Sequence, residues 1–340
     1  MIPETTRVVR IHEFGDASGL RIESLPVPAP AADQVMIEVH ALGLNRAEIM
    51  LRDDVYMEHP ELPSRIGYEA SGIVISVGDN VESVRIGDRV ATVPGFSMAQ
   101  FGVYAEHAVV PASVVARIPD NFTYEQGASI WMQYITAYGG LIDIGQLKGG
   151  DTVVITAAAS SVGIAAIQLA RLAGATVVAT TRNNDKADTL REFGADVVVN
   201  TSEASLADVV MTATNGHGAD LIFDAIGGAM LAEAAAAAAP RGTIVLYGAL
   251  DSRPTELPLI NALAKGLTVR GYTLFEISTD PARLARVIAY LNEVFTADAI
   301  RPLMDERRFL LDDIVDAQRY MESNEHIGKI VVNVAHGGHA

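Results

Sequence analysis

The 340-residue sequence contains no cysteine. This absence excludes disulfide bonds, zinc and iron–sulfur centres built on thiolates, and a cysteine nucleophile. Any metal site in this chain would have to use histidine and carboxylate ligands alone.

Basic residues are also scarce. The chain has 25 lysines and arginines against 42 aspartates and glutamates, which gives a formal net charge of -17. Nucleic-acid binding rests on a basic surface that neutralises phosphates. We therefore expect no nucleic-acid partner.

Long apolar runs are missing as well. The first ten residues, MIPETTRVVR, hold no apolar core of the kind that a secretory signal needs. The least polar stretch, residues 155–181, is interrupted by Ser160, Ser161, Gln168 and Arg171, whereas a membrane span needs about 20 apolar residues. The sequence predicts no membrane segment and a cytoplasmic protein.

The sequence divides into two regions with different residue patterns. With 49% hydrophobic and 20% charged residues, it is an ordinary globular chain, long enough for about two domains. Up to about residue 125, short β-type runs alternate with Gly, Pro and Asp, a pattern typical of a barrel or sandwich-like unit. From about Asp151, apolar strands alternate with helices, which predicts an α/β fold with a doubly wound parallel sheet. Its six strands are expected at residues 152–156, 176–181, 196–200, 220–225, 242–248 and 267–272.

Glycine and proline mark the expected helix ends. Helices over 162–173 and 185–193 are followed by Gly174 and Gly194, and the alanine-rich run 234–239 predicts a helix that Pro240 ends. Beyond the sheet, we expect helices over 281–296 and 311–323 and a last strand over 326–334. This last strand should pack back onto the first domain.

The strand at 152–156 runs into AAASSVG and then directly into a helix. This is the context of a dinucleotide-binding loop, whose three glycine positions fall here on Ala158, Ser160 and Gly163. Small residues at a helix N-terminus suit a phosphate group, since backbone amides and the helix dipole favour an anion there. The alternative is a strand-to-helix turn of small residues that binds no ligand.

The end of the second strand distinguishes the two common nicotinamide cofactors. NAD-binding sheets usually place a carboxylate there to hold the ribose hydroxyls. This sequence instead has Thr180, Thr181 and Arg182, with Lys186 four residues later. Cations and hydroxyls suit the 2′-phosphate of NADPH. The alternative is that Arg182 and Lys186 form a solvated helix face.

Several motifs resemble one known family in order and spacing. They are GLNRAE (43–48), the Tyr56 segment, GYEASG (67–72), VGDNV and IGDRV (77–90), the loop ITAAASSVGIAAIQLAR, NGHGAD (215–220), DAIGG (224–228) and HIGKIVV (326–332). The chain resembles the medium-chain dehydrogenase/reductase superfamily, in its zinc-free quinone oxidoreductase (zeta-crystallin-like) group. The resemblance implies a GroES-like catalytic domain at 1–125 and 272–340 and a Rossmann NADPH-binding domain at 126–271. It also implies a homodimer, or a tetramer, joined through the edge of the Rossmann sheet.

The departures from the superfamily concern zinc. Zinc-dependent members have a cysteine where this chain has Asn45, a histidine at Tyr68 and a second cysteine near Met132, and only Glu69 remains. They also carry a cysteine-rich lobe that has no counterpart here. Asn, Tyr and Met cannot form a tetrahedral zinc site, so we expect no metal and no alcohol oxidation of the zinc-assisted kind.

Without a metal, the easiest reaction is hydride transfer to an acceptor that is already electrophilic. Quinones and α,β-unsaturated carbonyls fit, because the protein then needs only to position the nicotinamide and donate hydrogen bonds to the developing oxyanion. The candidate catalytic residues are Asn45, Tyr56 and Tyr68, of which the resemblance supports Asn45 and Tyr56. Asn45 could instead cap the helix that follows it, and Tyr68 could simply fill the space of the zinc site.

The resemblance points to a larger set of cofactor contacts. These are Thr136, Ala158, Ser160, Ser161, Val162, Gly163, Thr181, Arg182, Lys186, Asn200, Ala225, Gly227, Tyr247, Gly248, Leu274, Phe275 and Lys329. Many follow a strand directly, where ligands bind in open α/β sheets. The turn glycines could equally serve backbone geometry alone.

Two further functions stay open. The chain could be a zinc-free carbonyl or alcohol oxidoreductase, or a non-catalytic NADPH-binding protein of the same fold. The histidines predict no metal set, because His40, His107 and His217 are isolated along the sequence. A weak adventitious metal site is conceivable only at His336 and His339 in the tail HGGHA.

Overall fold

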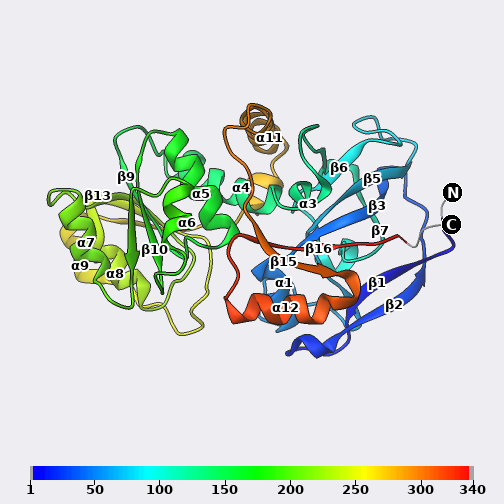
Figure 1. Cartoon of the computed structure of the whole chain (residues 1–340), viewed down its shortest axis with the longest axis horizontal. Helices are drawn as coiled ribbons and strands as arrows, with labels where there is room; N and C mark the ends of the chain where they lie inside the picture. The colour runs from blue at the N-terminus through cyan, green and yellow to red at the C-terminus, as the bar shows by residue number, and fades with distance from the viewer. Residues whose placement is uncertain (1–2, 337–340) are drawn as a thin grey trace. The chain divides into compact units, whose positions relative to one another are not determined.

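The computed structural model describes residues 3–336 and divides into two compact units. The first unit comprises residues 3–132, 292–297 and 302–336, and the second comprises residues 133–291 and 298–301. Each unit has its own sheets and helices (Figure 1). Within the described residues, no helix has the length and apolar character needed to cross a membrane.

The first unit is built on two sheets. The smaller has the strand order β2-β1-β4, and the larger has seven strands in the order β15-β16-β3-β5-β6-β8, with β7 paired to β3. The strands are β1 (Thr5–Ile11), β2 (Leu20–Pro26), β3 (Gln34–Gly43), β4 (Ser64–Arg65), β5 (Glu69–Val77), β6 (Arg89–Thr92), β7 (His107–Pro111), β8 (Val115–Arg117), β15 (Met304–Leu310) and β16 (Lys329–Asn333). Its helices are η1 (Ala17–Gly19), α1 (Arg46–Arg52), α2 (Met98–Phe101), η2 (Ala112–Val114), α3 (Tyr124–Gly127), η4 (Leu311–Asp313) and α12 (Ile314–Ser323).

The C-terminal strand confirms one expectation. β16 lies antiparallel to β3, with Val331 opposite Gly43, so the end of the chain packs onto the first unit. β3 is the centre of this sheet, because β16, β5 and β7 all pair with it. Successive side chains of a strand point to opposite faces, and on β3 the half-buried Glu38 and His40 share one face.

The second unit holds a six-stranded sheet in which every neighbouring pair is parallel. The order is β11-β10-β9-β12-β13-β14, so successive strands are added toward one side of β9 up to β11 and toward the other side from β12 onward. All six predicted strands are confirmed, as β9 (Thr152–Ile155), β10 (Thr176–Thr181), β11 (Val197–Asn200), β12 (Ala219–Asp224), β13 (Ala238–Leu246) and β14 (Thr268–Gly271).

Helices cover both faces of this sheet (Figure 1). On one face, apolar side chains of α7 and α8 pack against Val154, Val178, Ile222 and Ile244. The helices of the unit are α4 (Trp131–Tyr138), η3 (Gly139–Ile144), α5 (Ser161–Leu172), α6 (Ala187–Glu192), α7 (Leu206–Ala213), α8 (Met230–Ala237), α9 (Leu259–Lys265), α10 (Phe275–Ser278) and α11 (Pro281–Thr296), of which α4 begins and α11 ends in the first unit.

The alanine-rich prediction is wrong at its C-terminal end. Helix α8 stops at Ala237, and Ala238 and Ala239 already belong to strand β13. Ala238 pairs with Ala219 of β12, and the register shifts directly after this pair. Pro240 lies at this irregularity, where a strand tolerates a residue without an N–H donor.

The unit boundaries also differ from those expected. Residues 126–132 belong to the first unit and residues 272–291 to the second. The second shift has a clear cause, because the Tyr272 hydroxyl donates to the Ile135 carbonyl at 3.2 Å and Arg283 pairs with Asp143. Strand β15, which the sequence pattern did not indicate, lies parallel to β16 at the edge of the first unit's larger sheet.

Candidate functional site

The expected cofactor residues gather at one edge of the second unit's sheet. Because all six strands are parallel, their carboxyl ends meet at the same edge. With the exceptions of Thr136 on α4 and Lys329 in the first unit, every expected residue lies at or after such a strand end. The loop after β9 lies where the strand order reverses, which is the position that binds ligands in open α/β sheets.

The loop after β9 is tightly folded. Ala157 has a positive φ of 45°, and Ser160 is the N-cap of α5, its hydroxyl accepting the Gly163 N–H at 3.1 Å. A Cβ on Gly163 would lie 2.4 Å from the Ala158 carbonyl oxygen, so only glycine fits. Helix and loop therefore touch at Gly163, the third glycine position of the dinucleotide-binding pattern. Ser161 and Val162 form the first turn of α5, next to this contact, and both are half-buried.

A buried pair of side chains joins β9 and β12 at the reversal point. The Thr156 hydroxyl donates to the Asp224 carboxylate at 2.6 Å and accepts the Ala225 N–H at 2.9 Å. Asp224 also accepts the N–H of Gly227 at 3.0 Å, and Gly227 has a positive φ of 68°. This network fixes the turn that carries Ala225 and Gly227. Sequence reasoning did not single out Thr156 and Asp224, although each stands beside a small-residue turn at a strand end.

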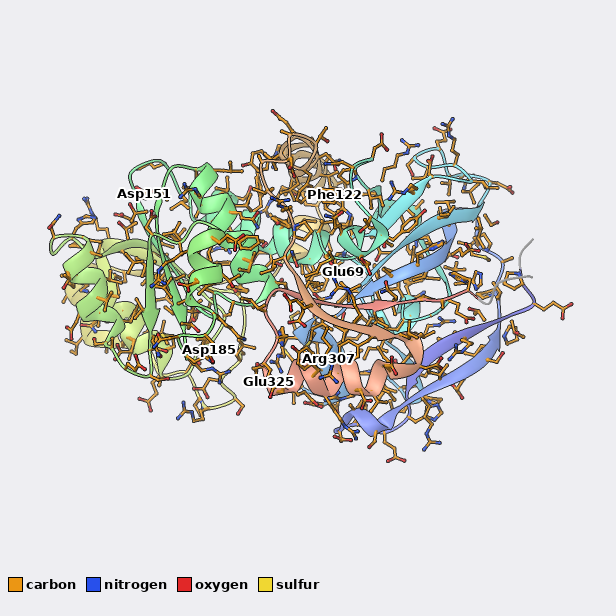
Figure 2. All side chains as sticks on the ribbon, viewed as in Figure 1. Glu69, Phe122, Asp151, Asp185, Arg307 and Glu325 are labelled. Atoms are coloured by element: carbon orange, nitrogen blue, oxygen red, sulfur yellow. The ribbon has the colours of Figure 1, made fainter. Side chains whose placement is uncertain are left out.

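The ends of β10 and β11 carry the residues expected near a 2′-phosphate. Thr181 is buried, Arg182 is exposed and Lys186 is half-buried at the start of α6. Asp185, labelled in Figure 2, lies in the same segment. Asn200 sits on the neighbouring strand, and its side chain accepts the Ser202 N–H at 3.0 Å. The two cations thus follow one strand end within a short turn.

The remaining cofactor candidates lie at the ends of β13 and β14. The ring of Tyr247 stacks on Phe223 at 3.9 Å, and burial raises the pKa of its hydroxyl. Gly248 is exposed, and a Cβ there would lie 2.7 Å from the Ala225 carbonyl oxygen. Leu274 is buried and Phe275 half-buried, at the start of α10.

In the first unit, a buried ion pair forms a second cluster. The Lys329 ammonium on β16 bonds the Glu69 carboxylate on β5, and it donates to the Asn45 amide oxygen at 2.6 Å. Lys329 and Glu69 are 0% and 1% exposed. The other Glu69 oxygen accepts the Met132 N–H at 2.9 Å. Glu69 is labelled in Figure 2. The expectation that Lys329 contacts the cofactor stays a prediction, and in this structure its ammonium belongs to the first unit's cluster.

Both the nitrogen and the oxygen of the Asn45 side-chain amide form hydrogen bonds. Its nitrogen donates to the Gly43 carbonyl and to Glu48, each at 3.1 Å, while its oxygen accepts from Lys329. It occupies the N-cap position of α1 and forms a capping box with Glu48, which accepts the Asn45 N–H. The capping alternative therefore holds for Asn45, whose side chain also contacts Lys329. Asn45 orients Lys329 and Glu48.

Glu48 is a buried carboxylate that the motif contained and that sequence reasoning did not select. It is 0% exposed and accepts the N–H of Asn45 and, at 3.1 Å, the N–H of Tyr68. Burial raises its pKa to about 7, while Lys329 and the hydrogen bonds oppose the rise. The spacing Asn-x-x-Glu, the signature of a capping box, could have identified it.

The two tyrosines form a pair of hydroxyls. Tyr68 donates to Tyr56 at 3.4 Å, and Tyr68 is buried at 2% exposure while Tyr56 is half-buried. Burial raises the pKa of Tyr56 to about 12 and raises that of Tyr68 as well, so both stay protonated. Tyr68 packs edge-on against Phe96 and Tyr56. Tyr68 thus fills space, as one of its two interpretations holds, and it also orients Tyr56.

These residues do not fit a zinc ion. Glu69 already binds an ammonium and a backbone N–H, and a second cation beside Lys329 would be repelled. Asn45 and Tyr68 stand where the resemblance expects thiolate and imidazole ligands, and the Asn45 oxygen is taken by Lys329. We therefore derive no reaction step through zinc at this site.

The two units match two known domain families. Residues 31–120 match the alcohol dehydrogenase GroES-like domain, and residues 161–291 match the zinc-binding dehydrogenase family. Together with the folds described above, they define a GroES-like domain and a Rossmann domain with a parallel sheet. This is the class of dehydrogenases and reductases.

Similarity to whole proteins narrows the class. The chain is 33% identical to the quinone oxidoreductase of Homo sapiens, covering 96% of this chain and 97% of that protein. The solved structure of Escherichia coli quinone oxidoreductase complexed with NADPH has a TM-score of 0.90 at 26% identity, covering 96% and 99% of the two chains. The chain is also 29% identical to the highly reducing polyketide synthase pspA of Penicillium soppii, but spans only 12% of its length. The chain belongs to the medium-chain dehydrogenase/reductase superfamily, in its quinone oxidoreductase group.

Proposed function

We propose that this protein is an NADPH-dependent reductase of quinones or α,β-unsaturated carbonyls that works without zinc. The observation that carries the proposal is the buried Lys329–Glu69–Asn45 cluster. The resemblance implies that zinc-dependent members have a metal ligand at the position of Asn45, and here the Asn45 oxygen binds Lys329 instead. An acceptor that is already electrophilic needs no Lewis acid. The quinone oxidoreductases among the relatives support the same substrate class.

The carboxyl edge of the second unit's sheet would hold the cofactor. The pyrophosphate fits the N-terminus of α5, where Gly163 permits close packing and backbone N–H groups are available. Bound NADPH supplies a hydride from its nicotinamide ring. The protein's own part is to fix the loop through Ser160, Thr156 and Asp224, so that little reorganisation is needed on binding.

Tyr56 is the side chain that we assign to the substrate oxygen. Because it accepts the hydrogen of Tyr68, its own hydrogen is available for an oxyanion. It is half-buried, whereas the Tyr68 hydroxyl lies behind it. A pKa near 12 keeps Tyr56 protonated at neutral pH, so it can donate to the charge that develops during reduction.

A panel of acceptors tests the proposal. Purified protein is mixed with NADPH and ortho-quinones, para-quinones, enones and alkenals, and absorbance at the nicotinamide band is followed. We expect oxidation of NADPH with at least one class. NADP-dependent oxidation of simple alcohols with no reduction of these acceptors would favour the zinc-free alcohol oxidoreductase. NADPH binding without any turnover would favour the non-catalytic alternative.

The preference for NADPH over NADH rests on Arg182 and Lys186. Replacing both by alanine should raise the KM for NADPH by about 10- to 100-fold, because a charge-assisted hydrogen bond is worth about 1.5–3 kcal/mol. The KM for NADH should change little. Arg191→Ala, which removes an exposed arginine paired with Asp188 on α6, is the matched control. Equal changes for both cofactors would show that the two cations do not contact the phosphate.

We further propose that two copies associate through the β14 edge of the Rossmann sheet. β14 is the last strand of the sheet, and α9, which precedes β14 along the chain and packs against β13, exposes Leu259, Ile260 at 78% and Leu263 at 71%. An apolar face of this kind suits a second copy of the chain. Ile260→Glu should convert the assembly to monomers in light scattering, and Leu310→Glu, at an exposed leucine of the first unit, should not. A cytoplasmic location stays a prediction from the sequence.

A further inference from the structure

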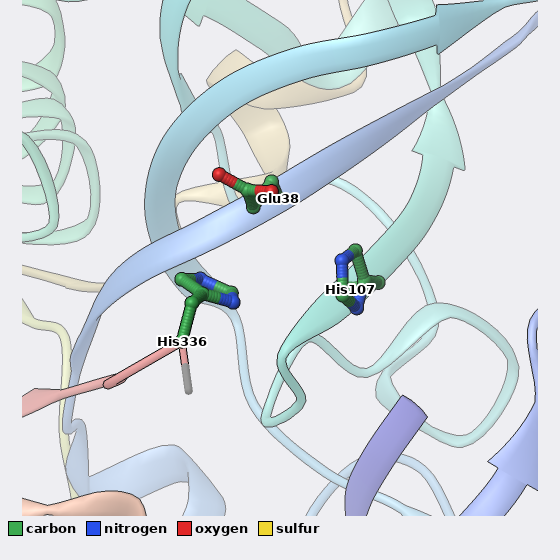
Figure 3. A group of neighbouring side chains, drawn as sticks. All are labelled: Glu38, His107 and His336. Atoms are coloured by element: carbon green, nitrogen blue, oxygen red, sulfur yellow. The ribbon is translucent and has the colours of Figure 1, made fainter. Parts of the chain in front are cut away.

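Three residues that the sequence separates widely meet on one face of the first unit's sheet. Glu38 lies on β3 directly opposite His107 on β7, and His336 follows β16, which pairs with β3 further along the same edge as β7, since β5 pairs with the other edge. One ligand atom of each lies within 4.8 Å of those of the other two (Figure 3). The sequence-based view of His107 as isolated and His336 as part of a tail missed this arrangement. His339, named with it, lies outside the described residues.

The contacts around these side chains resemble those that orient metal ligands. Nε2 of His336 donates to the Val39 carbonyl at 2.7 Å, so its other ring nitrogen keeps a lone pair. Nδ1 of His107 lies 3.1 Å from the Thr6 hydroxyl, which leaves Nε2 for an ion. Metal-bound histidines almost always place the second ring nitrogen against a carbonyl, hydroxyl or carboxylate in this way.

A third histidine lies beside the carboxylate. Nε2 of His40, two residues along β3 on the same face, lies 3.3 Å from Glu38 Oε1. The His40 ring in turn stacks on Tyr124 at 4.4 Å. The carboxylate therefore has a stacked imidazole ring as its neighbour. All these groups are half-buried, which leaves an ion partly shielded and still reachable.

Charge and geometry both suit a dication. Two imidazoles and a carboxylate form a donor set that zinc accepts, with three protein ligands and a fourth position for water. A tetrahedral ion with bonds of about 2.1 Å needs ligand atoms roughly 3.4 Å apart. Because the three atoms lie within 4.8 Å of one another, they must approach by at most about 1.4 Å.

We propose that Glu38, His107 and His336 bind one divalent transition-metal ion of the zinc type. The site shares no residue with the Lys329 cluster. Because its ligands come from β3, β7 and the segment after β16, the bound ion would clamp the end of the chain to the sheet. Its role would be structural, and hydride transfer would not require it.

Zinc binding to the full-length protein tests the proposal. After treatment with a chelator and its removal, Zn²⁺ is titrated in competition with a chromophoric chelator. We expect one ion per chain, and His107→Ala, His336→Ala and Glu38→Gln should each weaken binding by at least about tenfold. The control is His217→Ala in the second unit, where His217 is exposed beside Asp220. This variant should bind as the wild type does.

Two further readouts keep the test independent of folding and of activity. Zn²⁺ should raise the Tm of the wild type and of His217→Ala but not that of His107→Ala, since only the native state holds the ligands together. Cu²⁺ bound at one equivalent should show two coupled nitrogens in its electron paramagnetic resonance spectrum. No stoichiometric binding, or equal affinity in all the variants, would overturn the proposal.

Discussion

The two candidate regions are built in opposite ways. The cluster of the first unit consists of buried side chains from distant parts of the chain, with Lys329 and Asn45 separated by 284 residues and Lys329 and Glu69 by 260. The edge of the second unit's sheet consists of turns, where Ser160 bonds Gly163 and Asp224 bonds Gly227. One region depends on charge, and the other on backbone geometry.

Because the two regions are built differently, different kinds of substitution should destabilise them. A buried ion pair is strongly destabilised when one partner is removed, because the other charge is left in a dry environment. A tight turn fails when a side chain is added where there is no room. Charge substitutions should therefore damage the first unit most, and the addition of a methyl group should damage the second.

The largest effect is expected at Lys329. Lys329→Met leaves the buried Glu69 without its cation and should lower the free energy of unfolding by about 3–5 kcal/mol, measured by urea denaturation. Adding Glu69→Gln should recover part of this loss, because the uncompensated charge is gone. Lys148→Met, at an exposed lysine, should change stability by less than about 0.5 kcal/mol. If the free energy of unfolding of Lys329→Met changed as little as that of this control, the ion pair would contribute nothing to stability.

The second effect is a pH dependence that belongs to Glu48. Its pKa is raised from 4.5 to about 7 in the folded state, so the folded protein holds this proton more tightly than the unfolded chain does. The protonated Glu48 therefore contributes to the free energy of unfolding. This contribution is fully present below pH 4.5 and falls by about 3 kcal/mol as the pH rises to about 7. Urea denaturation at a series of pH values measures it.

Glu48→Gln should flatten this part of the pH profile. The level of stability will fall at every pH, because both Glu48 oxygens accept N–H groups and an amide cannot accept at both. The slope is therefore the decisive quantity. Glu82→Gln, at an exposed carboxylate, should keep the wild-type slope. An unchanged slope in Glu48→Gln would assign the pH dependence to another group.

The third effect concerns the loop of the second unit. Gly163→Ala places a Cβ against the Ala158 backbone, and relief of this contact should cost about 1–3 kcal/mol and weaken NADPH binding. Gly271→Ala on β14, where a Cβ meets nothing within 4 Å, is the control for stability. Fluorescence titration with NADPH and urea denaturation give the two values. Equal affinities in both variants would show that the loop tolerates the added carbon.

The same contrast explains what the sequence could predict. The six sheet strands and the loop that joins β9 to α5 depend on neighbours within a few residues, and local pattern is enough to place them. The end of α8 depends on the pairing of Ala238 with Ala219, which no local pattern contains. The Lys329–Glu69 pair, the raised pKa of Glu48 and the approach of His336 to His107 likewise arise only when distant strands pair.

The most direct measurement of the central claim follows the hydride itself. The protein is given NADPH carrying deuterium at the transferable nicotinamide position, together with an enone, in ordinary water, and the product is analysed by mass spectrometry and NMR. We expect one deuterium on the β-carbon of the saturated product, one proton from solvent on the α-carbon, and a lower rate in Tyr56→Phe. Absence of reduction with enones and quinones alike, or a product without deuterium, would contradict it.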